Sequence, residues 1–131
     1  MIPFKEELMK LHLPKGSYAL FGSALLSAYN LREAKDLDII VTQDLWEKLA
    51  KQYADHLKND PVRIHMGNIE IFKDWMILTH RIEEMIKSAD FIEDIPFVRI
   101  EYVLAWKRWR GRPKDIKDVQ QLEEIERLRG R

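Results

Sequence analysis

Asp36 and Asp38 stand two positions apart at the start of an apolar segment that ends at Val41. Side chains two positions apart on a β-strand project from the same face, so the two carboxylates are expected to point together. Adjacent carboxylates raise each other's pKa unless a cation lies between them. Hard divalent cations, above all Mg²⁺, suit a site made only of oxygen atoms. The pair therefore predicts a metal site; the competing interpretation is two solvated acids at a strand end.

Gly22 and Ser23 follow a short apolar run and precede a short predicted helix. A glycine lets the backbone approach a phosphate closely, and the N-terminus of the following helix offers free N–H donors. The Ser23 hydroxyl adds one more donor. Ser23 is equally typical of a helix N-cap, a role that is compatible with phosphate binding. We therefore expect a phosphate-binding turn where the first strand ends.

Glu70 stands between Ile69 and Ile71 in a second apolar segment. If that segment pairs beside the strand of the two aspartates, Glu70 joins the same site. Three carboxylates around two metal ions are suited to in-line phosphoryl or nucleotidyl transfer. The alternative is that Glu70 is a solvated cross-strand partner of a basic residue such as Arg63.

These residues together resemble a known family. Gly22-Ser23, twelve intervening residues and then Asp36-Leu37-Asp38-Ile39 are similar to the signature of the polymerase-beta-type nucleotidyltransferase superfamily, in which a later acid lies between apolar residues, as Glu70 does here. Arg32, shortly before the acids, resembles the small prokaryotic branches. The resemblance implies that Asp36, Asp38 and Glu70 hold two Mg²⁺ or Mn²⁺ ions. It also implies that Gly22 and Ser23 bind the β- and γ-phosphates of a nucleoside triphosphate (NTP).

The C-terminal part extends the resemblance to the AbiEii-type nucleotidyltransferases, which include toxins of toxin–antitoxin pairs. The residues that match their tail are Lys107, Arg112, Lys114, Asp115 and Asp118. The resemblance implies that Lys107 stabilises charge on the triphosphate and that Arg112 belongs to the phosphate site. Asp115 either orients one of these cations or occupies the first turn of the last helix, where an acid is favourable.

Two functions are consistent with these residues. The first is a metal-dependent nucleotidyltransferase that moves a nucleoside monophosphate (NMP) from an NTP to an unidentified acceptor hydroxyl on RNA, protein or a small molecule. The second is a catalytically inactive protein of the same fold that binds a nucleotide, RNA, a partner protein or a second copy of itself. The chain is short and has no recognisable acceptor-binding domain, which motivates the second function.

The elements that position these residues can be read from hydrophobic periodicity. The predicted helices span 3–13, 24–28, 43–57, 74–88, 100–110 and 113–128, and the predicted strands span 17–21, 37–41, 62–66 and 69–72, with 91–98 a strand or extended segment. Trp106 and Trp109, three positions apart, are expected to pack into the core. The prediction is a single α/β (α+β) domain over 1–131, with a small mixed sheet flanked by helices, a catalytic core over 17–73 and a helical tail over 98–128.

Composition narrows the possible functions. The 131 residues include 22 Lys plus Arg, 22 Asp plus Glu and no Cys, which excludes a disulfide scaffold, a Cys-ligated metal site and a Cys nucleophile. Zero net charge argues against a uniformly basic nucleic-acid binder, yet residues 1–98 carry 12 basic and 16 acidic groups while 99–131 carry 10 and 6. No long apolar run or signal peptide is visible, so we expect a cytoplasmic protein with no membrane contact.

Overall fold

Two apolar segments form the centre of the sheet in the computed structural model, which describes residues 2–129. β1 (Tyr18–Phe21) and β2 (Leu37–Val41) pair in antiparallel orientation. β2 also pairs, in parallel, with β5 (Ile69–Phe72). Nearly every residue of these three strands is buried, which explains their almost continuous apolar sequence.

Four further strands extend the sheet on both sides, giving the order β3-β4-β5-β2-β1-β7-β6. They are β3 (Leu57–Lys58), β4 (Arg63–Met66), β6 (Asp90–Ile92) and β7 (Ile95–Phe97). β4 and β5 form the predicted hairpin across Gly67-Asn68, where the positive φ of Gly67 (57°) suits a two-residue turn. The sheet is mixed and helices surround it, so the predicted α+β class is confirmed.

Six α-helices and two 3₁₀ turns complete the described residues. The α-helices are α1 (Lys5–Lys10), α2 (Ala24–Ala28), α3 (Gln43–Gln52), α4 (Ile82–Lys87), α5 (Ile100–Arg110) and α6 (Pro113–Leu128), and the 3₁₀ turns are η1 (Ala54–His56) and η2 (Met76–Arg81). α2, α5 and α6 have the predicted bounds. Gly111, with a φ of 65°, ends α5, and Pro113 opens α6. None of the helices within residues 2–129 is both long enough and apolar enough to span a membrane.

Three predicted helices are wrong in part. The helix expected over 3–13 spans only Lys5–Lys10, and His12, with a φ of 50°, lies outside it. The helix expected over 43–57 ends at Gln52, and Leu57 pairs with Ile64 at the edge of the sheet instead of extending the helical stripe. The helix expected over 74–88 begins as the 3₁₀ turn η2. There the Thr79 hydroxyl accepts a hydrogen bond from the Trp75 backbone N–H and donates one to a backbone carbonyl, each at 2.9 Å. Such local bonds compete with the regular helical pattern.

The segment over 91–98, expected to be a strand or extended, contributes to two strands instead. β6 and β7 form a hairpin whose turn residues, Glu93 and Asp94, both have positive φ values of 51° and 68°. This conformation matches the right-handed twist of the flanking strands. β7 then pairs in parallel with β1.

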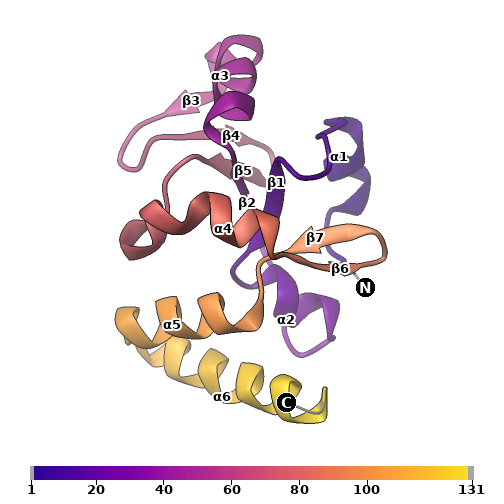
Figure 1. The fold of residues 1–131 in the computed structure, drawn as a ribbon, viewed down its shortest axis with the longest axis vertical. Helices are drawn as coiled ribbons and strands as arrows, with labels where there is room; N and C mark the ends of the chain where they lie inside the picture. The colour runs from indigo at the N-terminus through magenta and orange to yellow at the C-terminus, as the bar shows by residue number, and fades with distance from the viewer. Residues whose placement is uncertain (1, 130–131) are drawn as a thin grey trace.

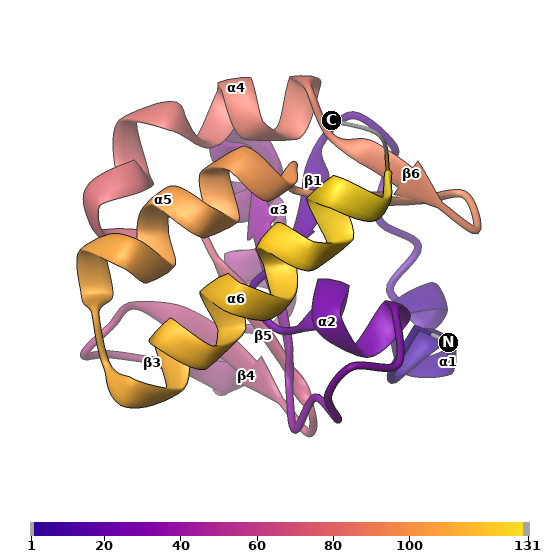
Figure 2. The same ribbon diagram turned by 90° about the horizontal axis from the view of Figure 1, so that it is seen from below.

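The helices lie around the sheet in a defined arrangement. α4 packs on β1 and β2, and α2 contacts both β1 and α6. α5 and α6 lie side by side below the sheet in Figure 1, and they are in front when the molecule is seen from below in Figure 2. This helical pair therefore stands at the end of the sheet where β1 meets α2.

Candidate functional site

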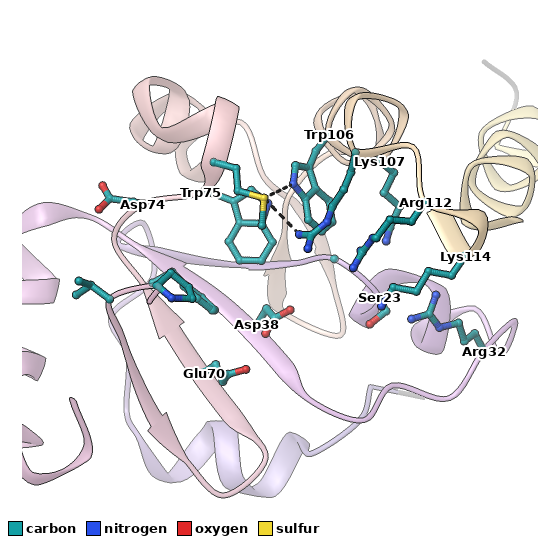
Figure 3. Close-up of a pocket in the computed structure, with 16 residues that line it drawn as sticks. Ser23, Arg32, Asp38, Glu70, Asp74, Trp75, Trp106, Lys107, Arg112 and Lys114 are labelled. Carbon is teal, nitrogen blue, oxygen red and sulfur yellow. Dashed lines mark hydrogen bonds between the residues drawn. The ribbon is translucent and has the colours of Figure 1, made fainter. Parts of the chain in front are cut away.

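Two predicted carboxylates meet on the sheet. Asp38 on β2 and Glu70 on β5 lie directly opposite each other in the parallel register, so their side chains project from the same face. Both line a pocket of about 420 Å³, which also contains Gly22, Ser23 and Lys107. Figure 3 shows Asp38 and Glu70 on neighbouring strands at one side of this pocket.

The ionised form of Asp38 is destabilised by its surroundings. Burial, followed by the negative charges of Glu70 and Asp36, raises the pKa of Asp38 to about 7, although Lys107 and Lys114 act in the opposite direction. The carboxylate form is therefore costly in the absence of a further positive charge. A hard cation in contact with the Asp38 and Glu70 oxygens would remove this cost.

Asp36 does not join this pair in the structure. It lies in a bend before β2 begins at Leu37, it is exposed, and the pocket lining does not include it. Its influence on Asp38 is through charge alone. Within residues 2–129, no three His, Asp or Glu side chains are grouped closely enough to hold a metal ion as they stand. The structure thus brings together two of the three predicted metal ligands.

Glu70 already has a cationic partner and a neighbouring histidine. Arg63 Nε donates to Glu70 Oε2 at 2.5 Å, and His65 Nδ1 lies 3.3 Å from the same oxygen. Arg63 Nη1 also donates to the carbonyls of Asn59 and Pro61 at 3.1 and 2.9 Å. The cross-strand pairing that the sequence offered as an alternative role for Glu70 is therefore present. A metal ion at Glu70 would share this carboxylate with Arg63.

The Gly22-Ser23 turn lies against Asp38. Gly22 has a φ of 76°, and a Cβ atom at this position would lie 3.5 Å from Asp38 Oδ2, so the backbone passes the carboxylate closely. Ser23 begins α2, but its side chain does not cap the helix and instead lines the pocket. Because α2 has only five residues, its dipole adds little. The hydroxyl and backbone of the turn remain the available phosphate donors.

Five cationic side chains line the pocket opposite the carboxylates: Arg32, Lys107, Arg110, Arg112 and Lys114. Four of them, all except Arg110, are labelled on that side in Figure 3. The positive charge of Arg112, followed by burial and the charges of Arg32 and Lys107, lowers the pKa of Lys114. Positive charge is thus crowded here, and an anion between these groups would relieve the repulsion.

Lys107 is held in a buried ion network. It is only 3% exposed, and its Nζ lies 3.0 Å from Asp118 Oδ2 and 3.6 Å from Asp115 Oδ1, both of which are also buried. Arg32 pairs with Asp118, and Arg112 Nε donates to Asp115 Oδ2 at 2.7 Å. Part of the charge of Lys107, which was expected to face a triphosphate, is therefore neutralised inside the protein.

Asp115 performs both of the roles that the sequence left open. It contacts Lys107 and Arg112, and it also accepts a hydrogen bond from the Arg112 backbone N–H at 3.1 Å in the first turn of α6. Burial acts to raise the pKa of Asp115, but the hydrogen bonds from Arg112 and the charge of Lys107 outweigh it and hold the pKa below its usual value. The same balance, with Arg32 and Lys107 as donors, lowers the pKa of Asp118.

Two pocket residues belong to no motif in the sequence, and one tryptophan outside the pocket does not lie where its spacing predicts. Trp75 and Met76 line the pocket although no motif singled them out. Trp109, expected in the core with Trp106, is 55% exposed. The buried stripe of α5 is centred on Lys107, and Trp109 lies on the opposite face at 100° per residue. Because the residue at the centre of the stripe is a lysine, hydrophobic periodicity does not indicate which face of α5 is buried.

Comparison with models of known protein families finds no match, and no curated protein is significantly similar to this chain. Functional assignment therefore rests on the chemistry of the pocket. That chemistry combines two sheet carboxylates, a serine turn and a crowded basic side.

We predict that Asp38→Asn stabilises the metal-free protein at neutral and alkaline pH. The folded state retains a proton on Asp38 that the unfolded chain has lost, so wild-type stability falls as pH rises from about 4 to about 7. The variant lacks this dependence and should be more stable by about 4 kcal/mol at pH 8, since each unit of pKa difference is worth about 1.4 kcal/mol. Urea unfolding across this range checks it. Excess Mg²⁺ should stabilise the wild type and leave the variant unchanged; equal responses would contradict a metal site at Asp38.

We predict that Asp118→Asn destabilises the fold by about 3 kcal/mol at pH 7, because it leaves buried Lys107 without its nearest partner. Glu123→Gln is the matched control, since Glu123 forms an exposed pair with Arg108 and its loss should cost less than about 1 kcal/mol. The pKa of Asp118 is lowered in the folded state, so the difference from wild type should shrink as pH falls below about 4. Equal losses in the two variants by urea unfolding would show that the network does not stabilise the fold.

Proposed function

We propose that the protein is a metal-dependent nucleotidyltransferase that moves an NMP from an NTP to an acceptor hydroxyl. One observation carries the proposal: negative charges repel one another on one side of the pocket, and positive charges repel one another on the other side. Asp38 beside Glu70 needs a cation, and Lys114 among Arg112 and Arg32 needs an anion. A metal-bound triphosphate supplies a cation to one side and an anion to the other.

Seven of the residues that line the pocket have a role in this proposal. Asp38 and Glu70 would hold Mg²⁺, which when bound neutralises phosphate charge and favours ionisation of the attacking hydroxyl. The Ser23 hydroxyl and the Gly22-Ser23 backbone would donate hydrogen bonds to phosphate oxygens beside Asp38. Arg112 and Lys114 would neutralise the triphosphate from the other side of the pocket. Lys107, anchored by Asp118, would add positive charge and hold α5 and α6 in place.

The transfer is an in-line displacement at the α-phosphorus. The acceptor oxygen forms a bond to this phosphorus while the bond to the bridging oxygen of the β-phosphate breaks. Pyrophosphate leaves toward the basic side of the pocket, and the hydroxyl proton passes to Glu70. Arg63, which contacts Glu70 Oε2, would hold this carboxylate in position during the proton transfer.

A second function is favoured by two specific observations. Asp36 lies outside the pocket, and Glu70 is already paired with Arg63, so fewer free carboxylates face the pocket than the proposed chemistry uses. The same pocket without transfer activity would bind a nucleotide or the phosphates of RNA. This function predicts binding of Mg²⁺–NTP with no covalent product.

Incubation with each NTP labelled at the α-phosphate, together with Mg²⁺, total RNA and protein extract, tests the proposal. The wild type should transfer label to an acceptor, and Asp38→Asn should lower the rate by at least about 100-fold because it removes a metal ligand. Asp74→Asn is the matched control: Asp74 also lines the pocket, but it is half exposed and pairs with Lys73. Equal labelling by wild type and Asp38→Asn would refute the enzyme, and binding by calorimetry without labelling would establish the second function.

A further inference from the structure

The pocket has a second, aromatic end that the proposed phosphate chemistry does not use. Trp75 lies at its centre, with ring centroids 4.5 Å from Phe21, 5.0 Å from Phe72 and 5.1 Å from Trp106. Phe72, Trp75 and Trp106 line the pocket itself. In Figure 3 the two tryptophans lie together beside the carboxylates.

This aromatic end is continuous with the carboxylates. Phe72 follows Glu70 by two positions on β5, and Phe21 is the β1 partner of Asp38, so all four side chains are on one face of the sheet. A ligand that places phosphates between Asp38 and the basic side can therefore extend into the aromatic end.

The aromatic end of the pocket has more hydrogen-bond donors than strong acceptors. Trp75 Nε1 is buried and has no partner. Trp106 Nε1 and Arg110 Nη1 both point to one acceptor, the Met76 sulfur, at 3.2 and 3.3 Å. A thioether sulfur is a weak acceptor, and a buried N–H without a partner is unfavourable. Three donors thus lack a strong acceptor that a ligand could supply.

The rim of this end is apolar and exposed. Met76 and Val62 both line the pocket and are 47% and 43% exposed. The Met76 side chain is unbranched and adaptable, so it can move aside when a better acceptor arrives. Exposed apolar side chains around a few convergent polar groups are typical of a site for a flat organic ring.

We propose that this aromatic end is the nucleobase subsite and that it prefers bases bearing a carbonyl group over adenine. The ring would lie against the pocket side of Phe72, Trp75 and Trp106, with Met76 and Val62 at its edge. Carbonyl oxygens of the base accept hydrogen bonds from Trp75, Trp106 and Arg110 in place of the Met76 sulfur, and adenine has no carbonyl oxygen to offer. The inference rests on the proposed function, because it takes an NTP as the ligand.

Calorimetric titration with Mg²⁺–tripolyphosphate, which has no base, and with Mg²⁺–GTP, Mg²⁺–UTP and Mg²⁺–ATP tests the subsite. GTP or UTP should bind at least about tenfold more tightly than tripolyphosphate, with ATP between them. If tripolyphosphate binds as tightly as every NTP, the nucleobase subsite is overturned while the phosphate site stands. If none of the four binds, the proposed function itself is overturned.

Trp75→Phe removes one N–H donor and keeps an aromatic ring. It should weaken GTP or UTP binding about fivefold to tenfold and leave tripolyphosphate binding unchanged. Trp109→Phe is the matched control, because Trp109 is exposed on α5 and lies outside the pocket lining. Equal effects of the two substitutions on GTP or UTP binding would overturn the subsite.

A second pair of variants keeps the test valid if Trp75→Phe fails to fold. Arg110→Lys retains the charge but removes the guanidinium donors, so it should also lower the preference for GTP or UTP over tripolyphosphate by about fivefold. Arg108→Lys is its control, since Arg108 pairs with Glu123 on the surface. An unchanged preference in Arg110→Lys would overturn the role of Arg110 in the subsite and the donor argument with it.

Discussion

The buried pairing of Lys107 with Asp115 and Asp118 is the constraint on which the pocket depends. A lysine ammonium can remain charged in an interior only when carboxylates surround it, so α5 and α6 have to pack with these side chains in contact. Arg32 extends the network from the segment that leads into β2. One set of charges therefore fixes the helical pair against the sheet and positions Arg32, Lys107 and Arg112 at the pocket.

Acids and bases are divided between two parts of the fold. The sheet carries Asp38 and Glu70, and the helical pair carries the larger share of the basic groups. Asp115 and Asp118 neutralise the inner cations, but the basic groups that face the pocket do not neutralise Asp38, whose pKa stays raised. A ligand that places positive charge at the carboxylates and negative charge at the basic groups would relieve the repulsion within each group, and this relief would favour binding. The aromatic end adds hydrophobic contact to this polar site.

The sequence was sufficient where a pattern is local. The hairpin across Gly67-Asn68 and the last two helices follow from turn chemistry, proline and periodicity. The parallel pairing that places Glu70 beside Asp38 depends on contacts between distant segments, so it follows from the sequence only as a condition. The burial of Lys107 depends on Asp118 in another helix, and Arg63 was foreseen only as an alternative partner of Glu70.

The contact between Arg32 and Asp118 joins positions 86 residues apart. Lys114 on α6 and Arg112 at its N-terminus line the pocket only when α6 is docked. A local opening of α6 would move these two cations away from the carboxylates while the sheet stays folded. A ligand that spans the pocket binds only the closed form, so it shifts this opening equilibrium toward closure. Amide hydrogen exchange in α6 and dissociation of such a ligand would then follow the same motion, with the last helix as the clamp of a site whose acids lie on the sheet.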